Sequence, residues 1–166
     1  MNKPLAVLFY GAGPTFFFGW GGWITSLGIW LLARRLRAMG IEARCYSFDD
    51  RSVYGDLVLA FNQRRPLLGY AYSLGNTALT YYQSRIPFRL VFCIAMSELA
   101  GHNNEPISKR NTKNSTLWRG PGILSDALVK GFDRVKFSNN PHLTIDFDQQ
   151  ISDDAIEQTK LALGIK

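Results

Sequence analysis

The sequence predicts a three-layer α/β/α fold, in which helices cover both faces of a mostly parallel β-sheet. Short apolar runs alternate five times with segments whose apolar residues recur at helical spacing. The run FRLVFCIAMS (88–97) is the most continuous apolar stretch of the second half, as expected for a central strand that is covered on both faces. This alternation predicts that functional groups gather beyond the carboxyl ends of the strands.

Length and composition support one globular unit. The chain has 166 residues, of which 46% are hydrophobic and 13% aromatic, and these values exclude a disordered protein. We therefore expect a single domain over residues 1–166.

The first half contains three predicted strand–helix pairs. The strands are expected at residues 5–10, 41–48 and 66–72, and the helices at 24–40, 49–63 and 74–84. Asp50 or Ser52 is the candidate cap of the second helix, and Gly40 ends the first one.

The second half is more irregular. After the strand at 88–97 we expect a polar, Asn-rich loop over about 101–120 and a short helix at 123–130. A strand at 134–138, a loop carrying His142 and a last helix over about 153–163 complete the order.

Charge and cysteine usage exclude several classes of function. Lys and Arg exceed Asp and Glu by 19 to 13, but the excess lies in scattered pairs, which favours a solvated surface over a nucleic-acid stripe. Cys45 and Cys93 lie in separate apolar segments and are expected to be buried thiols. No metal site or organic cofactor is implied.

The first 33 residues allow a second interpretation. No charged residue occurs from Pro4 to Ala33, and RRLR follows, as after a membrane span. Six Gly and Pro residues between 11 and 22 break this stretch into unlike halves, and a secretory signal fits poorly. We expect a soluble, cytoplasmic protein without a stable span, and a membrane-anchored protein remains the alternative.

Ser73 is the first candidate catalytic residue. It follows the apolar strand PLLGYAY, precedes a helix and lies between the small residues Ala71 and Gly75. This is the GxSxG pattern of a nucleophile elbow, with Ala in the first small position. The turn would lift the hydroxyl clear of the sheet and point the amino end of the helix at the reaction site.

A serine nucleophile needs a base and a group that orients the base. If the chain order is Ser, acid, His, the base is His142, since it follows the last strand; His102 is the other histidine. Glu98, just past a strand, is the best placed acid. The other carboxylates considered are Asp126, Asp133 and Asp146, of which Asp133 precedes its strand and should face the wrong end of the sheet.

An oxyanion would need two donors. The Leu74 N–H follows the nucleophile, and the glycine-rich turn after the first strand supplies Gly11 or Ala12. A phosphate-binding loop fits poorly, because no GK[ST] follows these glycines.

The segments LFYGAGP, SLGIWLLARRLRAMGIEA, YSLGNTA and HLTID resemble the small α/β-hydrolases of bacteria and phages, a compact branch of the lipase and esterase superfamily. The resemblance implies a minimal α/β-hydrolase fold without a cap domain. It also implies a nucleophile at Ser73, a base at His142 and an oxyanion loop at Gly11 and Ala12. Tyr10 stands where many relatives have histidine.

These observations predict a serine hydrolase for carboxylic esters with a small or lipid-like substrate. The aromatic segment 15–23 and the loop 101–120 are candidate substrate-selecting elements. A fold that has lost its chemistry and serves as a binding module is the alternative. The sequence does not determine the oligomeric state.

Overall fold

The computed structural model describes residues 2–11, 26–96, 104–120, 131–140, 145 and 148–165. Within these residues, a six-stranded parallel sheet has the order β2-β1-β3-β4-β5-β6. The strands are β1 (Leu5–Tyr10), β2 (Glu42–Ser47), β3 (Leu67–Tyr72), β4 (Leu90–Ile94), β5 (Ser115–Arg119) and β6 (Arg134–Phe137).

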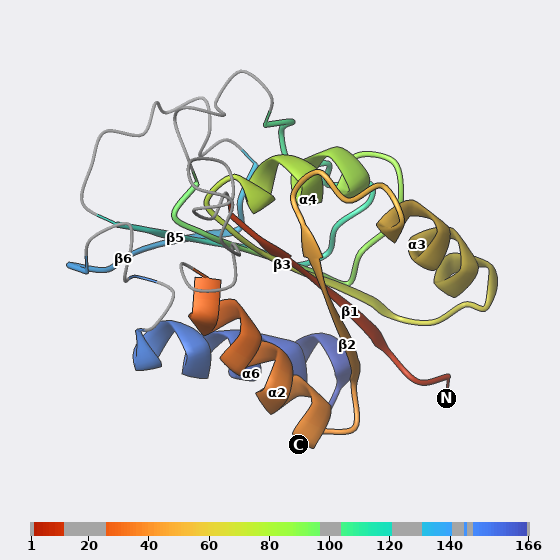
Figure 1. Cartoon of the computed structure of the whole chain (residues 1–166), viewed down its shortest axis with the longest axis horizontal. Coiled ribbons are helices and arrows are strands. Elements are labelled where there is room, and N and C mark those ends of the chain that lie inside the picture. Colours follow the sequence, from red (N-terminus) through yellow and green to blue (C-terminus); the bar gives the residue numbers. More distant parts are fainter. Residues whose placement is uncertain are drawn as a thin grey trace.

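Helices cover both faces of this sheet (Figure 1). On one face lie α2 (Leu27–Ala38) and α6 (Gln149–Leu163), and on the other lie α3 (Val53–Asn62) and α4 (Gly75–Gln83). The predicted three-layer α/β/α fold is therefore confirmed, and its sheet is parallel throughout.

Strand β1 shows how the two core layers form. Successive side chains of a strand point to opposite faces, so Leu5, Val7 and Phe9 pack in the layer under α3 and α4. Ala6 and Leu8 pack in the other layer, under α2 and α6. All five are at most 1% exposed, which explains why this strand carries no charge.

The uncharged stretch that suggested a membrane span contains β1 and the first part of α2. Helix α2 has 12 residues and buries Ile29, Leu32 and Leu36 against the sheet. Among the described residues, we find no helix with both the length and the apolar character needed to cross a bilayer.

Two sequence predictions in the second half were wrong. The expected loop over 101–120 contains a strand, β5, whose two large apolar residues are Leu117 and Trp118. So short a run gives almost no periodicity, and burial between β4 and β6 makes it a strand. The last helix begins at Gln149, four residues early, because the Asp148 side chain caps it by accepting from the Gln150 N–H at 2.9 Å. The expected helix 123–130 lies outside the described residues.

A buried carboxylate on α6 forms hydrogen bonds that connect this helix to the sheet. Asp154 of α6 accepts hydrogen bonds from Trp118 Nε1 at 2.7 Å, Lys136 Nζ at 2.8 Å and Gln158 Nε2 at 3.2 Å. Burial alone would raise the pKa of the Asp154 carboxyl, but these hydrogen bonds outweigh it and hold the pKa below its ordinary value of 3.8.

Asp154 should therefore make stability depend on pH. A carboxylate whose pKa is lowered by folding stabilises the protein above its unfolded pKa, and this stabilisation is lost as pH falls through the folded pKa. Asp154→Asn should lower the free energy of unfolding by about 2 kcal/mol at neutral pH. Urea denaturation should show that difference shrinking in strong acid.

The matched control is Asp153→Asn, the exposed neighbour whose carboxylate pairs with Arg35. An exposed pair contributes at most about 1 kcal/mol, so this variant should change stability less. An Asp154→Asn difference that is equal at neutral and acid pH would contradict the assignment.

Candidate active site

The connection between β3 and α4 is a sharp turn. Strand β3 ends at Tyr72 and α4 begins at Gly75, so Ser73 and Leu74 alone reverse the chain. Ser73 has a φ of +53°, in the left-handed region that residues other than glycine rarely adopt. This strained turn between a strand and a helix, with its partly exposed serine, is called the elbow below.

Asn76 holds this turn in place. Its buried side-chain amide donates from Nδ2 to the Ser73 carbonyl at 2.8 Å and to the Ile94 carbonyl at 2.9 Å. Ile94 ends the neighbouring strand β4, and its carbonyl also accepts from the Ser73 N–H at 3.0 Å. The strained serine is therefore anchored to β4 through both its N–H and its carbonyl.

Two glycines allow the backbone to approach the turn closely. A Cβ atom at Gly75 would lie 2.5 Å from the Phe9 carbonyl oxygen of β1. A Cβ atom at Gly11, just after β1, would lie 2.8 Å from the Ser73 Cβ atom. The small residue that the GxSxG pattern places at position 75 is required by the backbone of Phe9, on the neighbouring strand.

Ser73 lies where the sheet reverses its winding. Adjacent strands β1 and β3 are followed along the chain by helices on opposite faces, α2 and α4 (Figure 1). At such a switch point the chain leaves in opposite directions and a crevice opens beyond the carboxyl ends of the strands. Gly11 and Ser73 flank this position.

The backbone N–H groups of Gly11 and Leu74, both near Ser73, differ in whether they already donate a hydrogen bond. The Gly11 N–H donates to Ser26 Oγ at 3.2 Å, within the buried interior. We find no hydrogen bond from the Leu74 N–H within the described part of the chain. Leu74 is the N-cap residue of α4, whose first turn has no acidic side chain. The positive end of the helix dipole is therefore not offset there.

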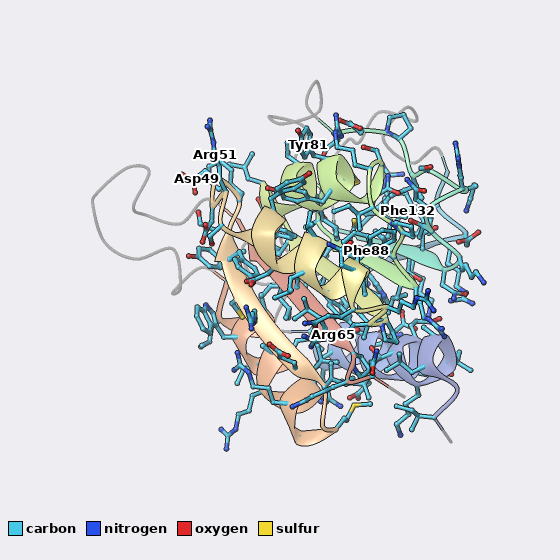
Figure 2. The ribbon with its side chains drawn as sticks, turned by 90° about the vertical axis from the view of Figure 1, so that its right-hand side faces the viewer. Asp49, Arg51, Arg65, Tyr81, Phe88 and Phe132 are labelled. Carbon is cyan, nitrogen blue, oxygen red and sulfur yellow. The ribbon has the colours of Figure 1, made fainter. Side chains whose placement is uncertain are left out.

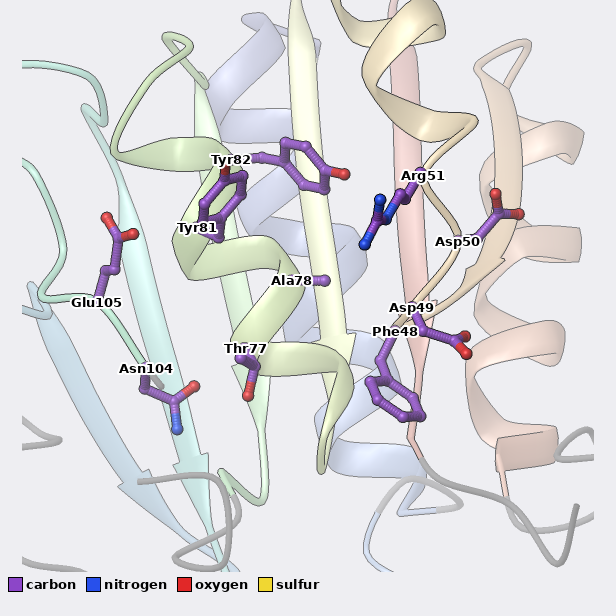
Figure 3. Close-up of a pocket in the computed structure, with 10 residues that line it drawn as sticks. All are labelled: Phe48, Asp49, Asp50, Arg51, Thr77, Ala78, Tyr81, Tyr82, Asn104 and Glu105. Carbon is purple, nitrogen blue, oxygen red and sulfur yellow. The ribbon is translucent and has the colours of Figure 1, made fainter. Parts of the chain in front are cut away.

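A cavity of about 570 Å³ lies over α4, one turn beyond the elbow (Figure 3). One side is charged, with Asp49, Asp50 and Arg51 from the loop after β2, and the helix supplies Tyr81 and Tyr82. Ser73 is not among its lining residues. Such a mixed wall suits a molecule with polar or aromatic groups better than a long alkyl chain.

Aromatic packing makes one wall of this cavity rigid. The Tyr82 ring stacks on Phe9 with centroids 5.9 Å apart, and Tyr81 meets it edge-on at 5.3 Å. The Arg85 guanidinium carbon lies 3.6 Å from the centroid of the Tyr81 ring. Burial is the main cause that raises the pKa of Tyr82, so its hydroxyl stays neutral near pH 7.

Several predicted site residues lie outside the described residues: Ala12, Glu98, His102, Asp126, His142 and Asp146, together with the whole segment 15–23. Asp133 is among the described residues, and the prediction that it faces the end of the sheet away from the site is confirmed. It accepts from the Ser115 N–H at 2.8 Å and pairs with Lys109, at the amino edge of the sheet and away from Ser73.

Sequence reasoning missed two supporting residues. In the sequence, Asn76 is not distinguished from any other polar residue in the first turn of a helix, and nothing shows that its side chain reaches Ile94. Ser26 precedes α2 and could be interpreted as a helix cap, but its side chain makes no cap hydrogen bond and instead accepts from Gly11. The contact between Asn76 and Ile94 and the contact between Ser26 and Gly11 each join separate segments of the chain, so a local sequence pattern does not show them.

Comparison with known proteins supports the fold. No protein-family model matches this sequence, and no curated protein matches it. Among solved structures, a Xanthomonas campestris pv. campestris protein assigned to the hydrolases of the alpha/beta superfamily is similar, with a TM-score of 0.63. The alignment covers 96% of this chain and 99% of that one, at 15% sequence identity.

The chain has an α/β-hydrolase-type fold. The resemblance noted in the sequence is thus confirmed at the level of the fold. Ser73 lies in the turn that joins β3 to α4 in this fold.

The close approach at Gly75 gives a stability prediction. A Cβ at Gly75 would collide with backbone atoms of Phe9, which cannot rotate away. Gly75→Ala should therefore lower the free energy of unfolding by about 1–3 kcal/mol. Chemical denaturation measures the change.

The matched control is Gly55→Ala in α3, where a Cβ would meet nothing within 4 Å. Alanine is the better helix former, so this variant should be more stable by about 0.5 kcal/mol. Equal effects of the two substitutions would show that the contact with Phe9 does not limit residue 75.

Proposed function

We propose that this protein is a serine hydrolase that cleaves carboxylic esters. The observation that carries the proposal is the left-handed backbone of Ser73, in a two-residue turn between a buried strand and a helix. A strained residue held by neighbouring groups is expected where geometry serves function. The α/β-hydrolase-type fold supports the same assignment.

In the proposed reaction, Ser73 Oγ attacks the carbonyl carbon of the ester while His142 takes the hydroxyl proton. The tetrahedral intermediate then expels the alcohol, which receives that proton from His142, and an acyl-enzyme remains. Water, deprotonated by the same histidine, attacks the acyl-enzyme; the C–O bond to Ser73 breaks, His142 returns the proton to Ser73 Oγ, and the acid is released. Glu98 is the proposed orienting carboxylate.

The proposed oxyanion hole combines two backbone donors. The Leu74 N–H lies at the amino end of α4, where the helix dipole favours negative charge. The second donor would come from the turn after β1. Because the Gly11 N–H donates to Ser26 Oγ, we assign this role to Ala12, with Gly11 providing the close approach to Ser73.

Hydrolysis of short-chain 4-nitrophenyl esters tests the nucleophile. Ser73→Ala should lower kcat/KM by at least about a thousandfold, because the covalent step is lost. A fluorophosphonate probe should label the wild type and not this variant. Ser52→Ala, at an exposed helix cap whose side chain makes no cap hydrogen bond, should keep both properties. A folded wild type that is neither active nor labelled would favour a binding module.

The two histidines can be separated by substitution. His142→Ala should lower kcat/KM by a factor similar to that of Ser73→Ala, since the two residues act as a unit. His102→Ala should retain at least about half of the activity. Circular dichroism would establish that both variants fold, and the reverse order of activities would move the base to His102.

A further inference from the structure

A second cavity lies at the opposite edge of the sheet from Ser73. It has a volume of about 530 Å³ and is formed where α3 ends and where β3 and β4 begin. Its apolar lining includes Leu67 and Phe88, which are each 2% exposed, and Phe61, which is 51% exposed. At roughly 3.3 Å per residue, the six residues of β3 put about 20 Å between this cavity and the elbow.

Five of the twelve residues that line this cavity are basic. They come from three separate segments of the chain and are Arg64, Arg65, Arg89, Arg110 and Lys113. No carboxylate lines the cavity among the described residues. Figure 2 shows Arg65 and Phe88 on this side of the molecule, with Asp49 and Arg51 near the other end of α3.

Most of this charge has no partner in the described part of the chain. Arg65 pairs with Glu42, but we find no ion pair or side-chain hydrogen bond there for Arg64, Arg89, Arg110 or Lys113. Like charges gathered around a concave surface repel one another and create a positive potential. An anion in the cavity would relieve this repulsion.

The backbone around the cavity is well fixed. The Arg89 N–H donates to the Leu67 carbonyl at 2.8 Å, and Phe88 forms a bridge with Thr112. These contacts join the loops that carry the cations. The cations are therefore presented from a preformed framework, as in most small-ligand sites.

The dipole of helix α3 does not account for all five basic residues that line the cavity. Carbonyl groups at the end of α3 favour nearby cations, and this explains Arg64 and Arg65. Arg89, Arg110 and Lys113 lie on other segments and have no such reason to be there.

Arg64 also occupies an unfavourable position for its residue type. Its φ is +54°, and it follows the last turn of α3, where glycine is the usual residue. An arginine there strains the backbone, so the local fold does not explain its presence. Arg64 is one of the residues that line the cavity.

We propose that this cavity binds a small molecule that carries two or more phosphate groups, at a site separate from Ser73. Arginine suits this role because its planar guanidinium can form paired hydrogen bonds with phosphate oxygens. The exposed Phe61 ring and the apolar floor would hold the organic part of the ligand. A cavity of this volume lies within the usual range for small ligands, of about 300–1,000 Å³.

This assignment can be tested by calorimetric titration of the full chain with three compounds, each in the absence of magnesium: ATP, pyrophosphate and adenosine. Thermal unfolding in the presence of each compound gives the change in Tm. ATP and pyrophosphate should bind and raise Tm, whereas adenosine should do neither. Arg64→Gly should weaken binding of both anions by about tenfold, and Arg89→Gln should act similarly. Because glycine suits the backbone at position 64, Arg64→Gly should fold at least as stably as the wild type.

The matched control is Arg34→Gln, an exposed arginine on α2, which should bind as the wild type does. Ser73→Ala should also bind both anions normally, so that this test is independent of the proposed esterase. Failure of both anions to bind would overturn the proposal, as would equal losses in Arg34→Gln and Arg64→Gly. Binding of a single-stranded oligonucleotide, without binding of either small anion, would instead show a nucleic-acid surface and overturn it.

Discussion

The geometry of the candidate site depends on one close approach, between the first residue of α4 and the backbone of β1. Gly75 lies so near Phe9 that even a methyl group would collide with the carbonyl oxygen. Since α4 must start there, only Ser73 and Leu74 remain to turn the chain, and Ser73 takes the left-handed backbone that so short a turn requires. The position of the Ser73 backbone is thus a consequence of packing between two core elements.

Strain at one residue persists only when neighbouring groups hold it. Here Asn76 is that group, because its side chain reaches the carbonyls of both Ser73 and Ile94. The buried amide ties the turn to β4, and the β4 strand is itself fully buried. A rigid turn of this kind keeps the hydroxyl-bearing residue in place, which is the preorganisation that the proposed acyl transfer would need.

The two edges of the sheet have different electrostatic character. Helices that follow parallel strands begin at the carboxyl edge, so their amino ends favour negative charge beside Ser73. At the amino edge the sequence places arginines and a lysine around a second cavity. Because the sheet is buried on both faces and about 20 Å deep along β3, Ser73 and the second cavity lie at opposite ends of a rigid layer.

The sequence by itself determined the layer architecture and the place of Ser73. Alternating apolar runs fix which segments are strands and helices, and a serine between small residues at a strand end is a local pattern. It did not reveal β5, because the polar sequence of that strand is buried only through its neighbours β4 and β6. In the sequence the basic residues are scattered, whereas the fold brings basic residues from three distant segments to one cavity. Only the tertiary structure decided these points, and likewise the contacts of Asn76 and Gly75, because they depend on distances between chain segments that no local pattern encodes.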